Sequence, residues 1–294
     1  MKCVLDPNIS KPHALRTAKQ AAGILHSLSA EVNAAESLAE HFCDQPFVRL
    51  LPQEQLFADA DFAVAVGGDG TILRCAEKLL RYAAENNTPP ARLVGINTGT
   101  LGFLAAIEAD ELDMLSRLQT GDYEISSRMM LRTQMQTAGG ETVPLHALND
   151  IYASRLNGKI CDFSVSVDER VIGSYRADGI IFSTPTGSTA YALSAGGPVM
   201  EPDLSLIEMN LICPHSLFAR PMLFAPQRRI TVTYRGVGNG GLCVHVDGKK
   251  TAELRNAESF TLTVSEHSIP FVNCKGHAFY DALHGKLMQP LKGM

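Results

Sequence analysis

The chain has 294 residues, of which 45% are hydrophobic and 19% are charged, so it is long enough for about two globular domains of ordinary composition. Its net charge is -5 and it has no run of basic residues, which argues against a nucleic-acid-binding surface. It lacks a window of ~18 uninterrupted apolar residues that could span a membrane, and its first ten residues have no apolar signal-peptide core. We therefore expect a cytoplasmic protein with no nucleic-acid partner and no membrane partner.

Short apolar runs alternate with helix-like patterns through the first third of the chain. Residues 11–28 are predicted to form a helix, with Ser10 as its cap and Pro12 in its first turn. Strands that alternate with helices indicate a parallel sheet covered by helices on both faces. The other predicted strands are 2–6, 30–34, 47–51, 62–66 and 92–96, and the other predicted helices are 36–43, 71–86 and 108–118.

From about Tyr123 the sequence changes to alternating and β-branched residues, which are typical of antiparallel strands. The pairs Gly139-Gly140 and Asn157-Gly158 are signals for hairpin turns. One helical segment near 188–196 interrupts the predicted strands, and the tail at 277–289 has a helical pattern.

The change of pattern predicts two domains. The first is an α/β N-terminal domain with a parallel sheet, residues 1–122, and the tail at 273–294 is expected to pack back on it. The second is a mostly antiparallel, all-β C-terminal domain, residues 123–272.

Seven scattered cysteines give no sign of a disulfide framework, because their number is odd and no C-x-x-C pair occurs. Most are expected to be small apolar residues in a reducing compartment. Cys243 and His245 resemble a fragment of a metal site, but no second ligand pair accompanies them, and structural zinc usually requires four ligands. We therefore predict no metal ion held by fixed protein ligands.

One carboxylate lies among three glycines where the predicted strand 62–66 gives way to a helix, in the motif GGDGT at residues 67–71. In an open parallel sheet, ligands bind beyond the carboxyl ends of the strands, and glycines there let the backbone approach an anion closely. Asp69 would project into that crevice, where a carboxylate can accept a proton from a hydroxyl or hold a metal ion. The plain alternative is a tight turn in which Asp69 caps the helix at 71–86.

Two further clusters follow along the chain. The glycine-rich loop GINTGTLGFLA at 95–105 follows the next predicted strand and would line the same crevice, although it could also be a plain strand-to-helix connection. In the segment 176–198, Arg176 and Asp178 precede an apolar strand, and small hydroxyl residues then lead into a short helix that Ser188 or a neighbour could cap. This segment could equally be an ordinary strand, turn and helix.

Two phosphate-binding motifs receive no support from the sequence. The P-loop pattern G-x-x-x-x-G-K-[ST] is absent. The run GVGNGG at 236–241 matches G-x-G-x-x-G, but it lies between two β-like segments and no helix follows it. We therefore predict a hairpin loop at 236–241.

The three glycine- and hydroxyl-rich clusters together resemble one family, the NAD kinases. The segments GGDGT, GINTGTLGFL, ALND, ADGIIFSTPTGSTAYALSAGGP and ARPMLF occur in that family's order and at about its spacing, over roughly residues 60–275. GGDGT is shared with diacylglycerol-type lipid kinases, whereas DGIIFSTPTGSTAYALSAGGP is far more specific. The resemblance implies transfer of the terminal phosphate of ATP, with Mg²⁺, to the 2′-hydroxyl of the adenosine ribose of NAD, which makes NADP.

The resemblance also implies roles for individual residues. Asp69 matches the proposed base for the ribose hydroxyl, with Gly70 beside it, and Phe103 matches a residue that packs near the adenine. Asn149 matches a residue that hydrogen-bonds the ribose diol, and Asp150 stands where the family usually has Glu, so this carboxylate is one methylene shorter. Further matched positions are Arg176, Asp178, Thr189, Ala190, Tyr191 and Ser194 at the dinucleotide, and Asp247 and Lys249 in a short acidic turn.

The chemistry of these residues agrees with the implied reaction. Phosphoryl transfer needs positioning and charge neutralisation more than covalent chemistry. Glycine loops leave room for phosphates, and Mg²⁺ would bridge the phosphate oxygens. An amide and a carboxylate at 149–150 suit a vicinal diol, because together they offer donor and acceptor atoms. The residues expected at the ATP phosphates are Gly67, Gly68, Gly70, Thr71, Asn97 and Gly99.

Relatives in this family are homodimers or homotetramers, so the resemblance implies an oligomer whose site borrows residues from a neighbouring chain. It places Arg176 and Asp178 near the nicotinamide half of NAD and close to a subunit boundary. The plain alternative is an exposed pair of opposite charges on one face of a strand.

Two other functions stay open at this point. A lipid kinase would share GGDGT but lack STPTGSTAY, and a catalytically silent dinucleotide-binding protein would lack Asp69. Inorganic polyphosphate stays open as a second phosphate donor beside ATP.

Overall fold

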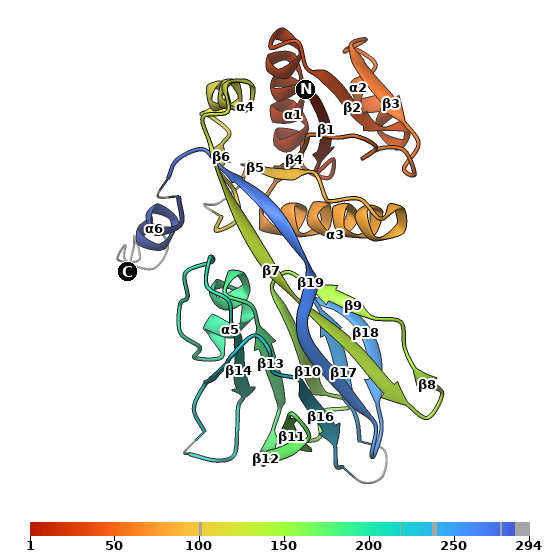
Figure 1. Ribbon diagram of the computed structural model, residues 1–294, viewed down its shortest axis with the longest axis vertical. Helices are drawn as coiled ribbons and strands as arrows, with labels where there is room; N and C mark the ends of the chain where they lie inside the picture. The colour runs from red at the N-terminus through yellow and green to blue at the C-terminus, as the bar shows by residue number, and fades with distance from the viewer. Residues whose placement is uncertain (100–101, 218, 237–239, 277, 286–294) are drawn as a thin grey trace. The chain divides into compact units, whose positions relative to one another are not determined.

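The computed structural model describes residues 1–99, 102–217, 219–236, 240–276 and 278–285. The chain divides into two compact units (Figure 1). Unit 1 comprises residues 1–127 and 269–294, and unit 2 comprises residues 128–268. Two long strands, β7 (Glu124–Thr137) and β19 (Ser259–Asn273), each run from one unit into the other.

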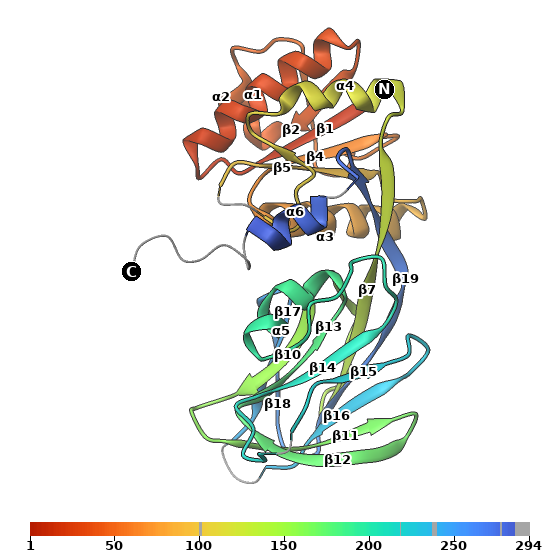
Figure 2. The ribbon, with the colours of Figure 1, turned by 90° about the vertical axis from the view of Figure 1, so that its left-hand side faces the viewer.

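Unit 1 is built around a parallel sheet. Its elements, in chain order, are β1 (Lys2–Pro7), α1 (Pro12–Ser27), β2 (Glu31–Ala35), the 3₁₀ helix η1 (Glu36–Leu38), α2 (Ala39–Phe42), β3 (Val48–Leu51), β4 (Phe62–Gly67), α3 (Asp69–Asn86), β5 (Arg92–Asn97), β6 (Ile107–Glu108), η2 (Leu112–Leu115), α4 (Ser116–Thr120) and α6 (Ala278–Leu283). The strand order is β5-β4-β1-β2-β3. Every residue of β4 is buried, as expected for a strand covered on both faces. Helices α1 and α4 lie on one face of the sheet and α3 on the other (Figures 1 and 2).

The strand order places both glycine-rich loops at one edge of this sheet. Strand β1 pairs with β2 on one side and with β4 on the other, so the direction in which the chain adds strands reverses between β1 and β4. In doubly wound sheets, ligands bind at the carboxyl ends of strands beside such a reversal. Strand β4 ends at Gly67 and the parallel strand β5 ends at Asn97, so the loops that follow them begin side by side.

The first helix begins where proline predicts it, but Ser10 does not cap it. Helix α1 begins at Pro12, and its cap residue, Lys11, makes no side-chain cap bond. The Ser10 hydroxyl instead donates a hydrogen bond to Oδ1 of Asn8 at 2.6 Å. The predicted cap is therefore wrong, because the helix begins at Pro12 and Lys11, not Ser10, occupies the cap position.

The helix predicted at 108–118 is only partly realised. Strand β6 occupies residues 107–108, where Ile107 pairs with Ile96 of β5. Helical turns begin only at Leu112. Pairing with the sheet edge therefore overrides the helical pattern in the first part of this segment.

The C-terminal segment returns to unit 1, as predicted. Phe271 of β19 pairs with Leu93 of β5 in parallel orientation. Helix α6 then covers residues 278–283 of the predicted helix. The remainder of that prediction, from residue 286 on, lies outside the described residues.

Unit 2 consists of two sheets with an apolar core between them. Apart from β7 and β19, its elements are β8 (Gly140–Glu141), β9 (Leu145–Ala147), β10 (Asp150–Arg155), β11 (Cys161–Val167), β12 (Arg170–Ala177), β13 (Gly179–Ser183), η3 (Thr186–Thr189), α5 (Tyr191–Ser194), β14 (Ile207–Ile212), β15 (Met222–Phe224), β16 (Ile230–Tyr234), β17 (Leu242–Val246) and β18 (Lys249–Leu254). One sheet has the order β15-β14-β13-β10-β17-β18, and in the other β12, β11, β16 and β19 are successive neighbours. Alternate residues face the core: Ile151 and Ala153 are fully buried in it, whereas Tyr152 between them is not.

The predicted architecture, a parallel α/β domain followed by a mostly antiparallel β domain, is confirmed. Gly139-Gly140 forms the predicted hairpin, in which Thr137 pairs with Gly140. The hairpin predicted at Asn157-Gly158 is wrong, although both residues have positive φ, 61° and 71°. The flanking strands β10 and β11 belong to different sheets, so this turn carries the chain from one sheet to the other.

The hairpin predicted at 236–241 is also wrong. The strands on either side of it, β16 and β17, belong to different sheets. Residues 237–239 of the loop itself lie outside the described residues.

The cysteines and the helices complete the description. All seven cysteines are free; Cys43 and Cys213 are exposed and the other five are buried. None of the helices in the described ranges is long and apolar enough to cross a membrane.

Replacing Phe163 by Ala should destabilise unit 2 strongly. Phe163 on β11 is fully buried in the core between the sheets and packs near Tyr175, with 6.1 Å between ring centroids. The loss of its ring should cost ~3–5 kcal/mol in the free energy of unfolding, measured by urea denaturation. The matched control is Val171→Ala on the neighbouring strand β12, where the side chain is 58% exposed and the expected change is within ~0.5 kcal/mol. Equal losses in the two variants would contradict the assigned core.

Candidate active site

The Asp69 carboxylate joins the two glycine-rich loops of unit 1. Its Oδ2 accepts a hydrogen bond from the backbone N–H of Phe103 at 3.1 Å, and Oδ1 accepts one from Leu104 at 3.3 Å. A side chain at Gly102 would overlap with this carboxylate, so only glycine allows the second loop to approach so closely. The cap position of α3 is occupied by Gly68, which has no side chain, and Asp69 is the first residue of the helix itself. The interpretation of Asp69 as a helix cap is therefore wrong.

Further contacts hold the start of both loops. The backbone N–H of Thr98 donates to the carbonyl oxygen of Gly67 at 3.2 Å. Gly67 also packs against the Thr71 side chain, which a Cβ at position 67 would meet. The motif and the second loop therefore share both backbone and side-chain contacts, as expected for two loops that line one crevice.

Asn97 is buried at the end of β5 and organises the second loop. Its Oδ1 accepts the backbone N–H of Gly99 at 3.1 Å, and its Nδ2 donates to Glu108 at 2.8 Å. A pocket of about 370 Å³ opens beside it and is lined by His13, Asn97, Thr98, Gly99, Glu108, Ala109 and Asp110. Polar groups at this edge of the sheet therefore border a space that can hold a small polar ligand group.

In unit 2 the Asp247 carboxylate holds the segment that contains Asn149 and Asp150. Oδ2 accepts the backbone N–H of Leu148 at 2.8 Å, and Oδ1 accepts those of Asn149 and Asp150 at 2.8 and 3.2 Å. Asp247 and Gly248 form the two-residue turn between β17 and β18, and both have positive φ, 46° and 78°. The turn therefore aims a carboxylate at three successive backbone donors about 100 residues away in the sequence.

The Asn149 side chain has a buried acceptor with no hydrogen-bond partner among the described residues, its Oδ1. Its backbone is fixed from the other side, because the carbonyl oxygen accepts the N–H of Thr184 at 2.9 Å and Gly187 packs directly against it. Thr186 Oγ1 is another buried polar atom for which the described part of the chain offers no partner. Sequence analysis missed Thr186, although the hydroxyl-rich run STPTGST was a signal for it. Unpaired buried polar atoms are costly, so this pair favours a polar ligand nearby.

Asp150 is 4% exposed at the start of β10. Burial, and after it the charge of Asp247, raises the pKa of Asp150 to about 7. A buried carboxyl that titrates near neutral pH is more often found at functional sites than in ordinary cores.

Tyr191 presents a half-exposed ring at the start of the short helix α5. Its ring makes an edge contact with Tyr152, with 5.0 Å between centroids, and Tyr152 stacks on His245 at 4.4 Å. Sequence analysis missed Tyr152, because it looked like an ordinary strand residue, and considered His245 only as part of a metal-site fragment. Thr189, Ala190 and Ser194 belong to the same short helical turns.

Ser188 does not cap α5, contrary to one of the sequence expectations. Its hydroxyl donates to the carbonyl oxygen of Pro185 at 2.7 Å and accepts the backbone N–H of Met200 at 3.0 Å. The serine is fully buried, so its role is to pin the loop that follows α5 to η3.

Strand register gathers most of the unit 2 candidates at one end of a sheet. Asp150 pairs with Ser183, just before the 184–194 segment, and Ile151 pairs with Val246, just before Asp247. Lys249, at the start of β18, is exposed beside this turn.

Asp178 precedes β13 at the other end of these strands, and Arg176 lies on β12 in the other sheet of unit 2. Ser154 of β10 pairs with Gly179, and the backbone N–H of Arg155 donates to the carbonyl oxygen of Asp178. Asp178 is therefore five residues along the strand from Asp150, or ~17 Å. Asp178 accepts a hydrogen bond from Arg155 at 2.8 Å, and Arg176 makes a two-bond ion pair with Asp162 at 2.8 and 2.9 Å. The suggestion that Arg176 and Asp178 pair with each other is therefore wrong, because each has a better-placed partner on a neighbouring strand.

Comparison with known proteins gives consistent results over nearly the whole chain. The ATP-NAD kinase N-terminal domain matches residues 7–123, and the ATP-NAD kinase C-terminal domain matches residues 148–274. The chain is 31% identical over 289 residues to the NAD kinase of Citrifermentans bemidjiense, which covers 97% of this chain and 98% of that protein. It is 36% identical over 236 residues to the NAD kinase of Aromatoleum aromaticum, which covers 80% of this chain and 76% of that protein.

Two solved structures have similar folds. The crystal structure of yeast NADH kinase complexed with NADH has a TM-score of 0.87 and 23% identity, over 100% of this chain and 89% of that one, and this likeness concerns the fold alone. The crystal structure of an NAD kinase from Archaeoglobus fulgidus in complex with ATP has a TM-score of 0.70 and 27% identity, over 98% of both chains.

The raised pKa of Asp150 predicts a specific pH dependence of stability. From the ordinary value of 3.8 up to about 7, the folded protein keeps a proton that the unfolded chain releases. This carboxyl therefore lowers the stability as the pH rises through that window, by at most ~4 kcal/mol. The side chain in Asp150→Asn cannot ionise. The difference in Tm, variant minus unmodified protein, should therefore be more positive at pH 8 than at pH 5. Asn149→Ala, which changes no titrating group, is the control; an Asp150→Asn difference that is the same at both pH values contradicts the prediction.

Proposed function

The chain belongs to the ATP-NAD kinase family and is an ATP-dependent kinase that acts on NAD, and we propose how its residues perform the reaction. The phosphate goes from ATP to the 2′-hydroxyl of the adenosine ribose, with Asp69 as the general base. The observation that carries this proposal is the Asp69 carboxylate held at the junction of the two glycine-rich loops. The family match leaves the lipid-kinase and silent-protein alternatives without support.

The proposed role of Asp69 is to orient the ribose hydroxyl and accept its proton. A hydroxyl is a poor nucleophile, so a fixed carboxylate within hydrogen-bond reach contributes both position and basicity. The bonds from Phe103 and Leu104 hold the carboxylate still.

The glycine-rich loops are proposed to hold the ATP phosphates. Helix α3 begins within GGDGT, so its first backbone N–H groups and its dipole favour an anion there. Gly68 and Gly70 leave room for close approach, since a Cβ at either position would meet no other atom. Asn97 and Gly99 would shape the second loop around the same group.

The residues at this edge fit a divalent ion that enters with ATP. Mg²⁺ usually keeps several waters and binds phosphate oxygens together with one or two carboxylates. Asp69 begins α3 after the first loop, and Glu108, on β6 after the second loop, accepts a hydrogen bond from Asn97. Bound there, Mg²⁺ would neutralise charge on the phosphate oxygens. The glycine-rich loops would position ATP, and Asp69 would position the ribose hydroxyl.

Asn149, Asp150 and their neighbours are proposed to bind the dinucleotide. The buried, unpaired Oδ1 of Asn149 could accept a hydrogen bond from a ribose hydroxyl, and Asp150 beside it could accept a second. Asp247 then acts as a positioning residue, because its carboxylate is engaged by the backbone of this segment. The half-exposed ring of Tyr191 suits contact with a base.

Arg176 and Asp178 are proposed to act on a neighbouring chain's ligand in a cytoplasmic homo-oligomer. Within one chain, Asp178 lies at the opposite end of its sheet from Asp150, and Arg176 belongs to the other sheet of unit 2. A second chain that presents this end to the ligand would reconcile that distance with their assignment to the dinucleotide. The Asp178 charge would then suit the positively charged nicotinamide ring of NAD.

The direct test of the activity is an assay of the purified chain with NAD, ATP and Mg²⁺, followed by NADP-specific detection. Time-dependent formation of NADP that requires both NAD and ATP is the expected result. An enzyme that is folded and binds NAD but forms no NADP would contradict the proposal.

Asp69→Asn should lower kcat by ~10²-fold or more, because Asn cannot accept a proton at neutral pH. The KM for NAD should change little, since the amide is the same size and keeps one oxygen acceptor for the second loop. Steady-state kinetics and Tm measure both effects. Glu85→Gln, an exposed change on the outer part of the same helix, is the matched control and should keep normal kinetics. Normal turnover of Asp69→Asn would remove Asp69 from the chemistry.

Mixing two variants that each lack one of these carboxylates should test whether sites are shared between chains. Asp69→Asn and Asp178→Asn chains carrying different affinity tags would be co-expressed, and oligomers that contain both would be isolated by two-step purification. Some sites would then combine an intact Asp69 with an intact Asp178, so activity should reappear above that of either variant alone. Mixed oligomers of two differently tagged Asp69→Asn chains are the control. No recovery in verified mixed oligomers would mean that each chain builds its own site.

A further inference from the structure

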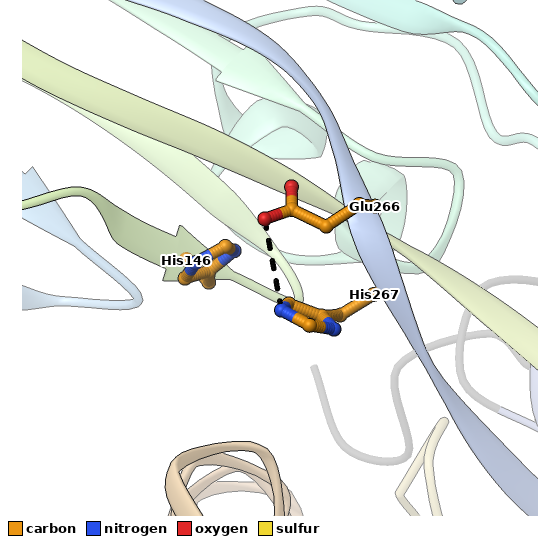
Figure 3. A group of neighbouring side chains, drawn as sticks. All are labelled: His146, Glu266 and His267. Carbon is orange, nitrogen blue, oxygen red and sulfur yellow. Dashed lines mark ion pairs between the residues drawn. The ribbon is translucent and has the colours of Figure 1, made fainter. Parts of the chain in front are cut away.

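A second group of potential ligands lies in unit 2, outside the candidate active site. It consists of His146 on β9 and the neighbours Glu266 and His267 on β19, whose ligand atoms all lie within 4.8 Å of one another. The three side chains converge on one space (Figure 3). Nε2 of His267 is 3.7 Å from Oε1 of Glu266, and the two imidazole rings are 5.4 Å apart between centroids.

Ser265 contacts both histidines of this group. Its Oγ lies 2.9 Å from Nδ1 of His146 and accepts the backbone N–H of His267 at 3.0 Å. Because Nδ1 of His146 is engaged, Nε2 is the ring nitrogen available to a ligand. An outer partner that fixes the ring of a histidine in this way is typical of metal sites.

We propose that His146, Glu266 and His267 bind a divalent transition-metal ion, Zn²⁺ by the chemistry of the ligands. Two imidazoles and one carboxylate are a common set for this ion, with a fourth position left for water. Ligand atoms at ~2.0–2.2 Å from zinc lie ~3–3.5 Å apart, so rotation of the three side chains is enough to close the group around an ion. Mg²⁺, which prefers oxygen ligands, is a poor match.

His146 is half-buried and Glu266 is exposed, so an ion has a route to the group from solvent.

Arg132 is the nearby group that opposes a cation. It lies directly opposite His146 in the register of β7 and β9, and its charge acts on both His146 and Glu266. Removing this positive charge should therefore strengthen metal binding, whereas removing a ligand should weaken it, which gives the proposal a second test.

The test uses the full chain with any polyhistidine tag removed, after dialysis against a chelator. Because exposed thiols also bind zinc, Cys43 and Cys213 are first changed to Ser. Zn²⁺ is then titrated in competition with a colorimetric zinc indicator. One Zn²⁺ per chain is expected, with an affinity that falls by at least ~10-fold in His146→Ala and in His267→Ala, since even outer-shell partners contribute ~10–100-fold.

Further variants separate this site from other binding. Glu266→Gln changes an exposed side chain and should weaken binding without affecting the fold, as checked by circular dichroism and Tm. Arg132→Gln should tighten it. His245→Ala, which removes the histidine beside Cys243 with a sulfur-to-nitrogen distance of 3.9 Å, should leave binding unchanged. Co²⁺ used as a probe should give visible absorption without a thiolate charge-transfer band.

Several results would overturn the proposal. These are the absence of stoichiometric Zn²⁺ binding, binding that both His146→Ala and His267→Ala leave unchanged in folded protein, and loss of binding in His245→Ala with a Co²⁺–thiolate band. None of these measurements depends on kinase activity, so their outcome is independent of the proposed function.

Discussion

Carboxylates that accept backbone hydrogen bonds hold the candidate site in place. In unit 1 the Asp69 carboxylate binds the N–H groups of Phe103 and Leu104, and in unit 2 the Asp247 carboxylate binds three successive N–H groups at residues 148–150. Loops at strand ends have backbone donors that must be paired when they are buried. A charged acceptor pairs them more strongly than a neutral one does. Each carboxylate thereby fixes a segment that is distant in the sequence, and the local geometry of the candidate residues in each unit depends on its own carboxylate.

This arrangement leaves other polar groups in costly environments. Asn149 Oδ1 is buried without a partner among the described residues. Burial, and after it the charge of Asp247, raises the pKa of Asp150 to about 7. Both features lower the stability of the folded protein. Buried polar groups without partners are expected at functional sites, where a ligand rather than the fold pairs with them. These two destabilising features therefore support a binding role for residues 149–150 more strongly than the sequence of this segment does.

Features with a local cause were predictable from the sequence, and features decided by distant partners were not. The apolar run of β4 and the hairpin at Gly139-Gly140 follow from composition and turn chemistry, and both were predicted correctly. Asn157-Gly158 adopts the expected turn conformation, but the choice of sheet for the next strand is a tertiary decision. The role of Asp247 had no local signal, because its hydrogen-bond partners lie 97 to 99 residues away. Tyr152 was missed for the same reason, since its ring contacts come from other segments.

The central claim is that Asp69 is positioned to take the proton of the hydroxyl that receives the phosphate. A crystal structure of the chain with NAD, Mg²⁺ and a non-hydrolysable ATP analogue measures this directly. The account predicts that one carboxylate oxygen of Asp69 lies ~2.6–3.2 Å from the 2′-hydroxyl oxygen of the adenosine ribose. A bound NAD whose 2′-hydroxyl is out of reach of Asp69, even through one bridging water, and instead contacts a different acceptor would contradict it.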